Sequence, residues 1–124
     1  NPGAGLAVAE ALTEQEERNP RPLVLIAGMI NTKDQTGYFR AFHGMARHVY
    51  TVPVTTSEAG VPNDELAVRA GEAGLSAEPV SSVANALMLL RDGWDEREAP
   101  PRILIGGSLY LVGAVLAENG TPPV

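Results

Sequence analysis

RILIGGSLYLVG, residues 102–113, is the stretch of sequence that decides the fold. It opens with a short apolar run rich in β-branched residues, which favours a strand. Gly106 and Gly107 then predict a tight turn, and Ser108 can cap the helix whose apolar residues follow at helical spacing. A strand, a glycine turn and a capped helix are typical of an open parallel sheet, which presents backbone N–H groups to ligands at such corners.

The composition is ordinary for one globular domain. The 124 residues are 44% hydrophobic and 19% charged, enough to bury a single core. The net charge of −6 argues against a nucleic-acid or anionic-membrane surface, although a phosphate pocket needs few basic groups. The absence of cysteine excludes disulfides and thiolate metal sites and is compatible with a cytoplasmic location. No apolar run approaches the roughly eighteen residues of a membrane span.

Four strands are expected, at residues 23–28, 48–54, 75–80 and 102–105. The first is apolar throughout, which suits a strand buried on both faces of a parallel sheet. Pro53 indicates that the second strand ends irregularly or lies at an edge. The third reads as a short edge strand.

Helices are expected to alternate with these strands, over residues 2–18, 35–47, 62–74, 83–92 and 109–118. The alternation predicts right-handed crossovers and an α/β fold with three layers, in which helices cover both faces of a mostly parallel sheet. Residues 1–124 read as a single domain, because no repeat or linker divides them. Asn1 suits a helix N-cap, and a chain that begins on a cap suggests a missing strand before it.

Two loops are candidates for binding an anion. Residues 106–108 combine glycines with a helix start, although the residues alone favour a tight connection capped by Ser108, which is compatible with binding. Lys33, the only lysine of the chain, and Asp34 follow the first buried strand, at the edge where α/β sheets bind ligands. Lys33 suits a phosphate or carboxylate and Asp34 a ribose or a metal-bound water; the alternative is a solvated lysine beside a helix cap.

The two histidines indicate no metal site. Neither His43 nor His48 stands at a metal-ligand spacing, and both read as surface or strand-end residues. Spacing alone assembles neither a Ser/His/Asp triad nor a carboxylate pair. The residues by themselves therefore indicate a small α/β domain with one or two loops suited to anions.

Three stretches carry a resemblance to a known family. They are NPGA at residues 1–4, LIAGMINTKD at residues 25–34 and GGSLYLVGAVLAENG at residues 106–120. Together they resemble the C-terminal domain of folylpolyglutamate synthase/dihydrofolate synthase, the folate branch of the Mur ligase family, whose fold is Rossmann-like. The resemblance covers nearly the whole chain, and residues 55–101 match by pattern only.

The resemblance implies an amide ligase that adds L-glutamate to folate or dihydropteroate. In such enzymes ATP and Mg²⁺ activate the carboxylate as an acyl phosphate, and a larger N-terminal ATPase domain carries the P-loop. The C-terminal domain closes over the nucleotide and contributes to the glutamate site. No P-loop motif occurs in this sequence, so we expect the chain to be inactive alone.

The resemblance also assigns roles to four residues. Asn1 matches the last residue of the family motif DGAHN, which serves ATP and substrate. Ser108 matches a serine that helps bind the incoming glutamate, and Lys33 and Asp34 match a Lys-Asp element assigned to nucleotide or closure contacts. The family often has an acidic residue before that lysine, where this chain has Asn31-Thr32, so no metal ligand is assigned.

Two other functions fit the same residues. One is a free-standing α/β module that binds a small anion at residues 106–108 without catalysis. The other is a structural assembly domain that pairs through a bare strand edge. A P-loop domain encoded upstream of Asn1 would distinguish the ligase from the free-standing module, and light scattering would reveal the association of an assembly domain.

Overall fold

The structure is a computed structural model that describes residues 2–31 and 34–107. Within these ranges the strands are β1 (Leu23–Ala27), β2 (Ala46–Thr51), β3 (Ala77–Pro79) and β4 (Arg102–Gly106). They form one parallel sheet in the order β3-β2-β1-β4. The short edge strand and the parallel sheet predicted from the sequence are thereby confirmed; the single domain and the strand expected before Asn1 stay predictions.

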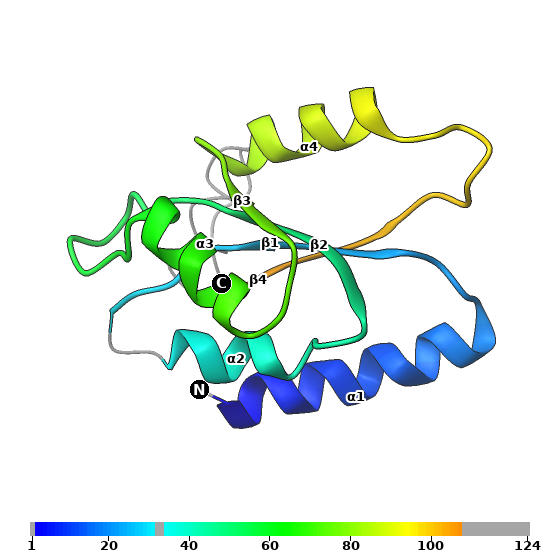
Figure 1. The fold of residues 1–124 in the computed structure, drawn as a ribbon, viewed down its shortest axis with the longest axis horizontal. Helices are drawn as coiled ribbons and strands as arrows, with labels where there is room; N and C mark the ends of the chain where they lie inside the picture. The colour runs from blue at the N-terminus through cyan, green and yellow to red at the C-terminus, as the bar shows by residue number, and fades with distance from the viewer. Residues whose placement is uncertain (1, 32–33, 108–124) are drawn as a thin grey trace.

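Helices cover both faces of the sheet (Figure 1). They are α1 (Pro2–Arg18), α2 (Gln35–Arg40), α3 (Asn63–Glu72) and α4 (Val83–Gly93). The first three share one apolar cluster with the sheet, and α4 packs on the opposite face. The predicted three-layer α/β fold is therefore confirmed.

The sequence of β1 explains why two cores form. Leu23, Leu25 and Ala27 point into the cluster beneath α1 to α3, whereas Val24 and Ile26 point into the cluster beneath α4. All five residues are buried, so the strand needs apolar side chains on both faces. The absence of alternation in this stretch is thus a consequence of its central place.

The helix expected over residues 35–47 was predicted too long. It ends at Arg40, a turn follows, and Ala46 and Arg47 already belong to β2. Gly44 has a φ of 78°, a left-handed conformation that does not continue a right-handed helix. Phe42 stands at helical spacing from Phe39 and packs in the same core, but it does so from the turn, which is why the sequence predicted a longer helix.

The second strand also differs from its expected bounds. β2 lies between β1 and β3 and ends at Thr51, so Pro53 stands beyond the strand and not at a sheet edge. The chain still follows β1 for one more step, since the Val52 amide donates to the Ala27 carbonyl at 2.9 Å. The irregular end that Pro53 indicated is the alternative that the structure supports.

The start of α3 is tied to the ends of β2 and β3 by a buried polar contact. The Thr51 hydroxyl, fully buried, donates to the Asn63 carbonyl at 2.7 Å. The Asn63 amide group donates to the Val80 carbonyl at 2.8 Å. These bonds fix the loop between β2 and α3 at the carboxyl edge of the sheet.

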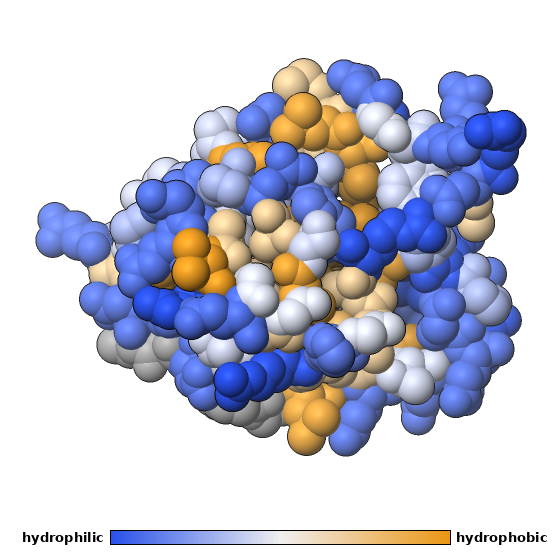
Figure 2. Space-filling view, viewed as in Figure 1, coloured by the Kyte–Doolittle hydropathy of each residue, from blue (hydrophilic) through white to orange (hydrophobic). Residues whose placement is uncertain are grey.

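The surface is mostly hydrophilic, with apolar side chains gathered along α4 (Figure 2). Leu87, Met88 and Leu89 are among the exposed large apolar residues there. None of the helices in the described ranges combines the length and the apolar character needed to cross a membrane.

Candidate functional site

The carboxyl ends of β1 and β4 meet at one corner of the sheet. The Gly28 amide donates to the Gly106 carbonyl at 3.3 Å. Gly107 has a φ of 108°, and a Cβ on it would lie 2.6 Å from the Gly28 carbonyl oxygen. The loops that follow β1 and β4 therefore begin side by side.

The same contacts explain the glycines of this corner. The backbone conformation of Gly107 and the nearby Gly28 carbonyl both exclude a side chain at this position. A glycine is therefore required here whether or not the corner binds a ligand. These glycines thus form the tight connection that was the alternative to an anion site.

The loop after β1 is held from its other side by the loop after β2. The Asn31 amide donates to the Ala59 carbonyl at 2.7 Å, and the Val61 amide donates to the Met29 carbonyl at 2.8 Å. Ile30 and Gly60 form an antiparallel bridge between these two hydrogen bonds. The stretch that leads to the Lys-Asp pair is consequently anchored on both sides.

Asp34 caps α2, as one of the sequence alternatives predicted. Its Oδ1 accepts a hydrogen bond from the Gly37 amide at 3.0 Å, and the side chain is exposed at the carboxyl edge. A role in nucleotide binding stays a prediction. Asn1, Lys33, Ser108 and the helix expected over residues 109–118 lie outside the described residues.

Two substitutions of Asp34 separate the contribution of its capping oxygen to stability from that of its charge. Asp34→Ala should lower the free energy of unfolding by about 1 kcal/mol, because the Gly37 amide loses its acceptor. Asp34→Asn keeps an acceptor and should lose less than roughly half as much. Urea denaturation of the two variants measures this; equal losses would contradict the capping role.

Tyr38 forms part of the floor of this corner and was not selected from the sequence. A Cβ on Gly106 would lie 3.0 Å from its hydroxyl oxygen, and burial raises the pKa of the phenol. No local pattern indicates this contact, because Tyr38 and Gly106 are far apart in the sequence. The adjacent glycines Gly106 and Gly107 indicate that some group approaches the turn closely, but not that this group is Tyr38.

His48 has a carboxylate partner that sequence spacing could not show. Its Nε2 lies 3.0 Å from Glu78 Oε1 and its Nδ1 lies 2.9 Å from Ser76 Oγ. His48 is the third residue of β2 and its side chain is partly exposed, so it is a surface histidine, as expected, but does not stand at the end of the strand. No three His, Asp or Glu side chains of the described residues gather closely enough to hold a metal ion.

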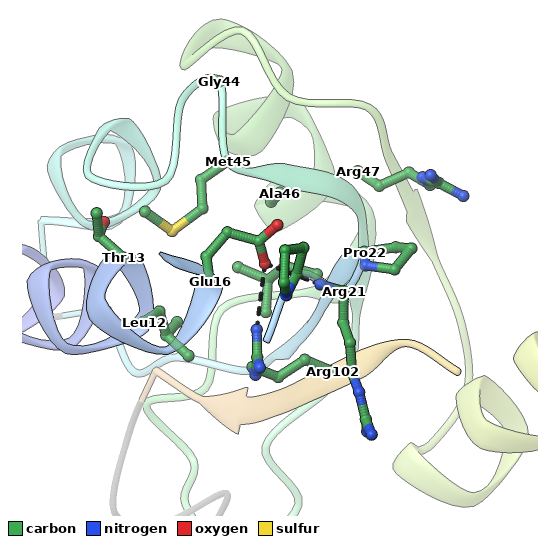
Figure 3. Close-up of a pocket in the computed structure, with 12 residues that line it drawn as sticks. Leu12, Thr13, Glu16, Arg21, Pro22, Gly44, Met45, Ala46, Arg47 and Arg102 are labelled. Carbon is green, nitrogen blue, oxygen red and sulfur yellow. Dashed lines mark hydrogen bonds and ion pairs between the residues drawn. The ribbon is translucent and has the colours of Figure 1, made fainter. Parts of the chain in front are cut away.

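A hollow of about 690 Å³ opens at the opposite, amino edge of the sheet (Figure 3). Arg102 lines it, donating to Glu16 Oε2 at 3.3 Å and to the Asn19 carbonyl at 3.0 Å. The guanidinium thereby satisfies a carbonyl at the end of α1, where a cation is favoured. The hollow is separated from the candidate site by the length of the strands.

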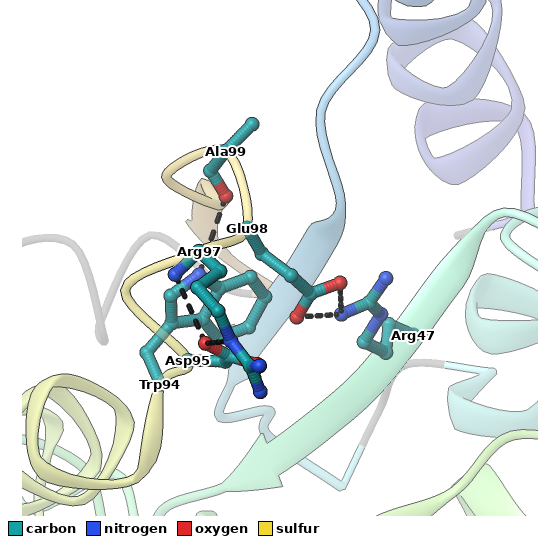
Figure 4. Close-up of polar contacts among 6 residues, drawn as sticks. All are labelled: Arg47, Trp94, Asp95, Arg97, Glu98 and Ala99. Atoms are coloured by element: carbon teal, nitrogen blue, oxygen red, sulfur yellow. Dashed lines mark hydrogen bonds and ion pairs between the residues drawn. The ribbon is translucent and has the colours of Figure 1, made fainter.

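The loop before β4 is held by a second set of polar contacts (Figure 4). Arg47 donates to both carboxylate oxygens of Glu98 at 2.8 Å and lies 5.3 Å from the centre of the Trp94 ring. The Trp94 indole donates to the Ala99 carbonyl at 3.2 Å. Both charged side chains are about half exposed, so we assign these contacts to positioning the loop.

Comparisons with known proteins give the fold. No protein-family model matches the chain, and no curated protein matches it. Among solved structures, folylpolyglutamate synthase of Mycobacterium tuberculosis, complexed with ADP and AMPPCP, is similar over 100% of this chain and 29% of its own, with a TM-score of 0.82 and 22% identity.

Two further structures agree. Escherichia coli FolC, in complex with DHPP and ADP, is similar over 97% of this chain and 27% of its own, with a TM-score of 0.68 and 24% identity. A bifunctional folylpolyglutamate synthase/dihydrofolate synthase with Mn, AMPPNP and L-glutamate bound matches over the same shares, with a TM-score of 0.71 and 21% identity. The chain thus spans under a third of the length of each of these proteins and has the fold of that part.

Proposed function

We propose that the chain is the C-terminal domain of an ATP-dependent ligase that adds L-glutamate to folates, to dihydropteroate, or to both. The observation that carries the proposal is the match of the whole chain to part of folylpolyglutamate synthase, at a TM-score of 0.82. The three sequence stretches that resemble this family support it, because two of them, residues 25–34 and 106–120, include the ends of β1 and β4, which meet at one corner.

The described residues suit a domain that completes a site held mainly elsewhere. They contain no cluster of metal ligands, and the whole sequence has no P-loop, so ATP and Mg²⁺ would be held mainly by an N-terminal ATPase domain. ATP supplies the phosphoryl group that activates the folate carboxylate. This chain would contribute Ser108 to the glutamate and Asn1, Lys33 and Asp34 to the nucleotide or to domain closure, in the cytoplasm.

The proposal is tested on the full-length protein encoded by the gene. The reading frame upstream of Asn1 should encode a P-loop domain, and the purified protein should turn over ATP to ADP and phosphate only when both glutamate and a folate or dihydropteroate are present. Residues 1–124 alone should show no such turnover. Turnover by this chain alone, or a gene without the P-loop domain, would overturn the proposal and favour the small-anion binding module.

Ser108→Ala should raise the glutamate KM about tenfold and change the ATP KM less than about twofold, because one hydrogen bond to a charged carboxylate is lost. Steady-state kinetics of the full-length protein, with each substrate varied in turn, measures both constants.

Ser82→Ala is the matched control. The Ser82 hydroxyl accepts from the Asn85 amide at 3.0 Å and caps α4 on the far face of the sheet. It should lower stability and leave both KM values unchanged. Equal changes of the two KM values in Ser108→Ala would indicate a structural cap instead.

A further inference from the structure

Tyr38 lies where α1, α2 and the end of β4 meet. Its hydroxyl oxygen faces Gly106, on which a Cβ would come within 3.0 Å of it. A Cβ on Gly5 of α1 would lie 3.0 Å from the Tyr38 carbonyl oxygen and 3.2 Å from its Cδ2. Both neighbours therefore approach Tyr38 as closely as a glycine allows.

The ring of Tyr38 has no room to retreat from Gly106. It packs edge-on against Phe39, with ring centres 5.7 Å apart, and in a tilted arrangement against Phe42, with ring centres 5.4 Å apart. Both phenylalanines are fully buried, and Tyr38 itself is 8% exposed. Because close-packed side chains transmit displacement and do not absorb it, the core fixes the position of the phenol oxygen.

The turn that follows Gly106 is equally tight on its other side. Gly107 lies against the Gly28 carbonyl, and a Cβ on it would also come within 3.0 Å of Met29 Cγ. The Gly28 amide donates to the Gly106 carbonyl at 3.3 Å. A shift of Gly106 must therefore move the start of the loop after β1 as well.

We infer that Tyr38 is a positioning residue whose phenol oxygen sets where the turn at Gly106 and Gly107 lies against β1. The inference rests on the proposed function, in which the serine after this turn binds the carboxylate of the incoming glutamate. Tyr38 would thus affect how tightly glutamate is bound through the position of the turn, and not through a contact with glutamate or ATP.

The test is a double-mutant cycle in the full-length protein, read by steady-state kinetics. Gly106→Ala adds a methyl group against the phenol oxygen and should raise the glutamate KM about tenfold, with the ATP KM changed less than about twofold. Tyr38→Phe removes the oxygen and should raise the glutamate KM about threefold. In the double variant the methyl group takes the vacated space, so the glutamate KM should return to within about twofold of wild type.

Two control variants match these changes. Tyr50→Phe removes a hydroxyl from a buried tyrosine in the cluster beneath α4, on the other face of the sheet. Gly71→Ala adds a methyl group with no atom within 4 Å of it. Both should leave the glutamate KM unchanged.

The outcomes separate this inference from the proposed function. A wild-type protein without glutamate-dependent turnover overturns both. If the wild type is active, three results overturn only the role of Tyr38. These are effects of the two substitutions on the glutamate KM that simply add, equal changes of the glutamate and ATP KM values, and a coupling of the substitutions in the melting temperature alone. If Gly106→Ala does not fold, Tyr38→Phe decides, and an unchanged glutamate KM in it overturns the role.

Discussion

Gly107→Ala should lower the free energy of unfolding by at least about 3 kcal/mol, from two costs that add. The first is the left-handed backbone, with a φ of 108°, which a residue with a Cβ adopts at a cost of about 1–2 kcal/mol. The second is overlap, since the new Cβ would lie 2.6 Å from the Gly28 carbonyl oxygen. That atom cannot yield easily, because it belongs to the backbone directly after β1, a strand that is paired on both sides.

Gly44→Ala isolates the first cost. Gly44 has a similar φ of 78°, yet a Cβ there would meet no atom within 4 Å. Its loss should be about 1–2 kcal/mol, well below that of Gly107→Ala. Urea denaturation of both variants of this chain measures the difference, and similar losses would contradict the contact between Gly107 and Gly28.

Phe42→Ala should lower the free energy of unfolding by about 3–5 kcal/mol, the usual cost of removing a buried aromatic ring. Phe42 is fully buried although it stands in the turn after α2, where it packs 5.4 Å from the Tyr38 ring. The cavity would open beneath α1 to α3, in the cluster that holds that face of the sheet together.

Leu6→Ala serves as the exposed counterpart, because Leu6 is 54% exposed on α1. Its loss should stay below about 0.5 kcal/mol. Chemical denaturation compares the two variants. A loss below about 1 kcal/mol for Phe42→Ala would mean that the turn does not pack as described.

The strands could be predicted from the sequence because their signals are local. Leu23 to Ala27 are apolar without alternation, which already required burial on both faces. The end of α2 could not be predicted in the same way. Phe39 and Phe42 keep a helical spacing, and only the left-handed Gly44 shows that the chain has turned toward β2.

Some contacts of the candidate site could likewise be predicted from the sequence and others could not. A parallel sheet brings the loops after its strands to one edge, so the neighbourhood of Gly28 and Gly107 follows from the predicted fold. The contact of Tyr38 with Gly106 and the pair of His48 with Glu78 do not follow, because the strand order alone does not say which side chains face each other. Such contacts depend on register, which no short stretch encodes.

The position of β1 between β2 and β4 has a consequence for the growing chain on the ribosome. β2 is synthesised soon after β1, but β4 follows only after α3, β3 and α4. Until then the most apolar strand has one side of unpaired amides and carbonyls, the kind of edge that recruits other chains. Completion of the sheet therefore waits for a late, long-range pairing, and nascent chains that end before Arg102 are the ones most exposed to aggregation.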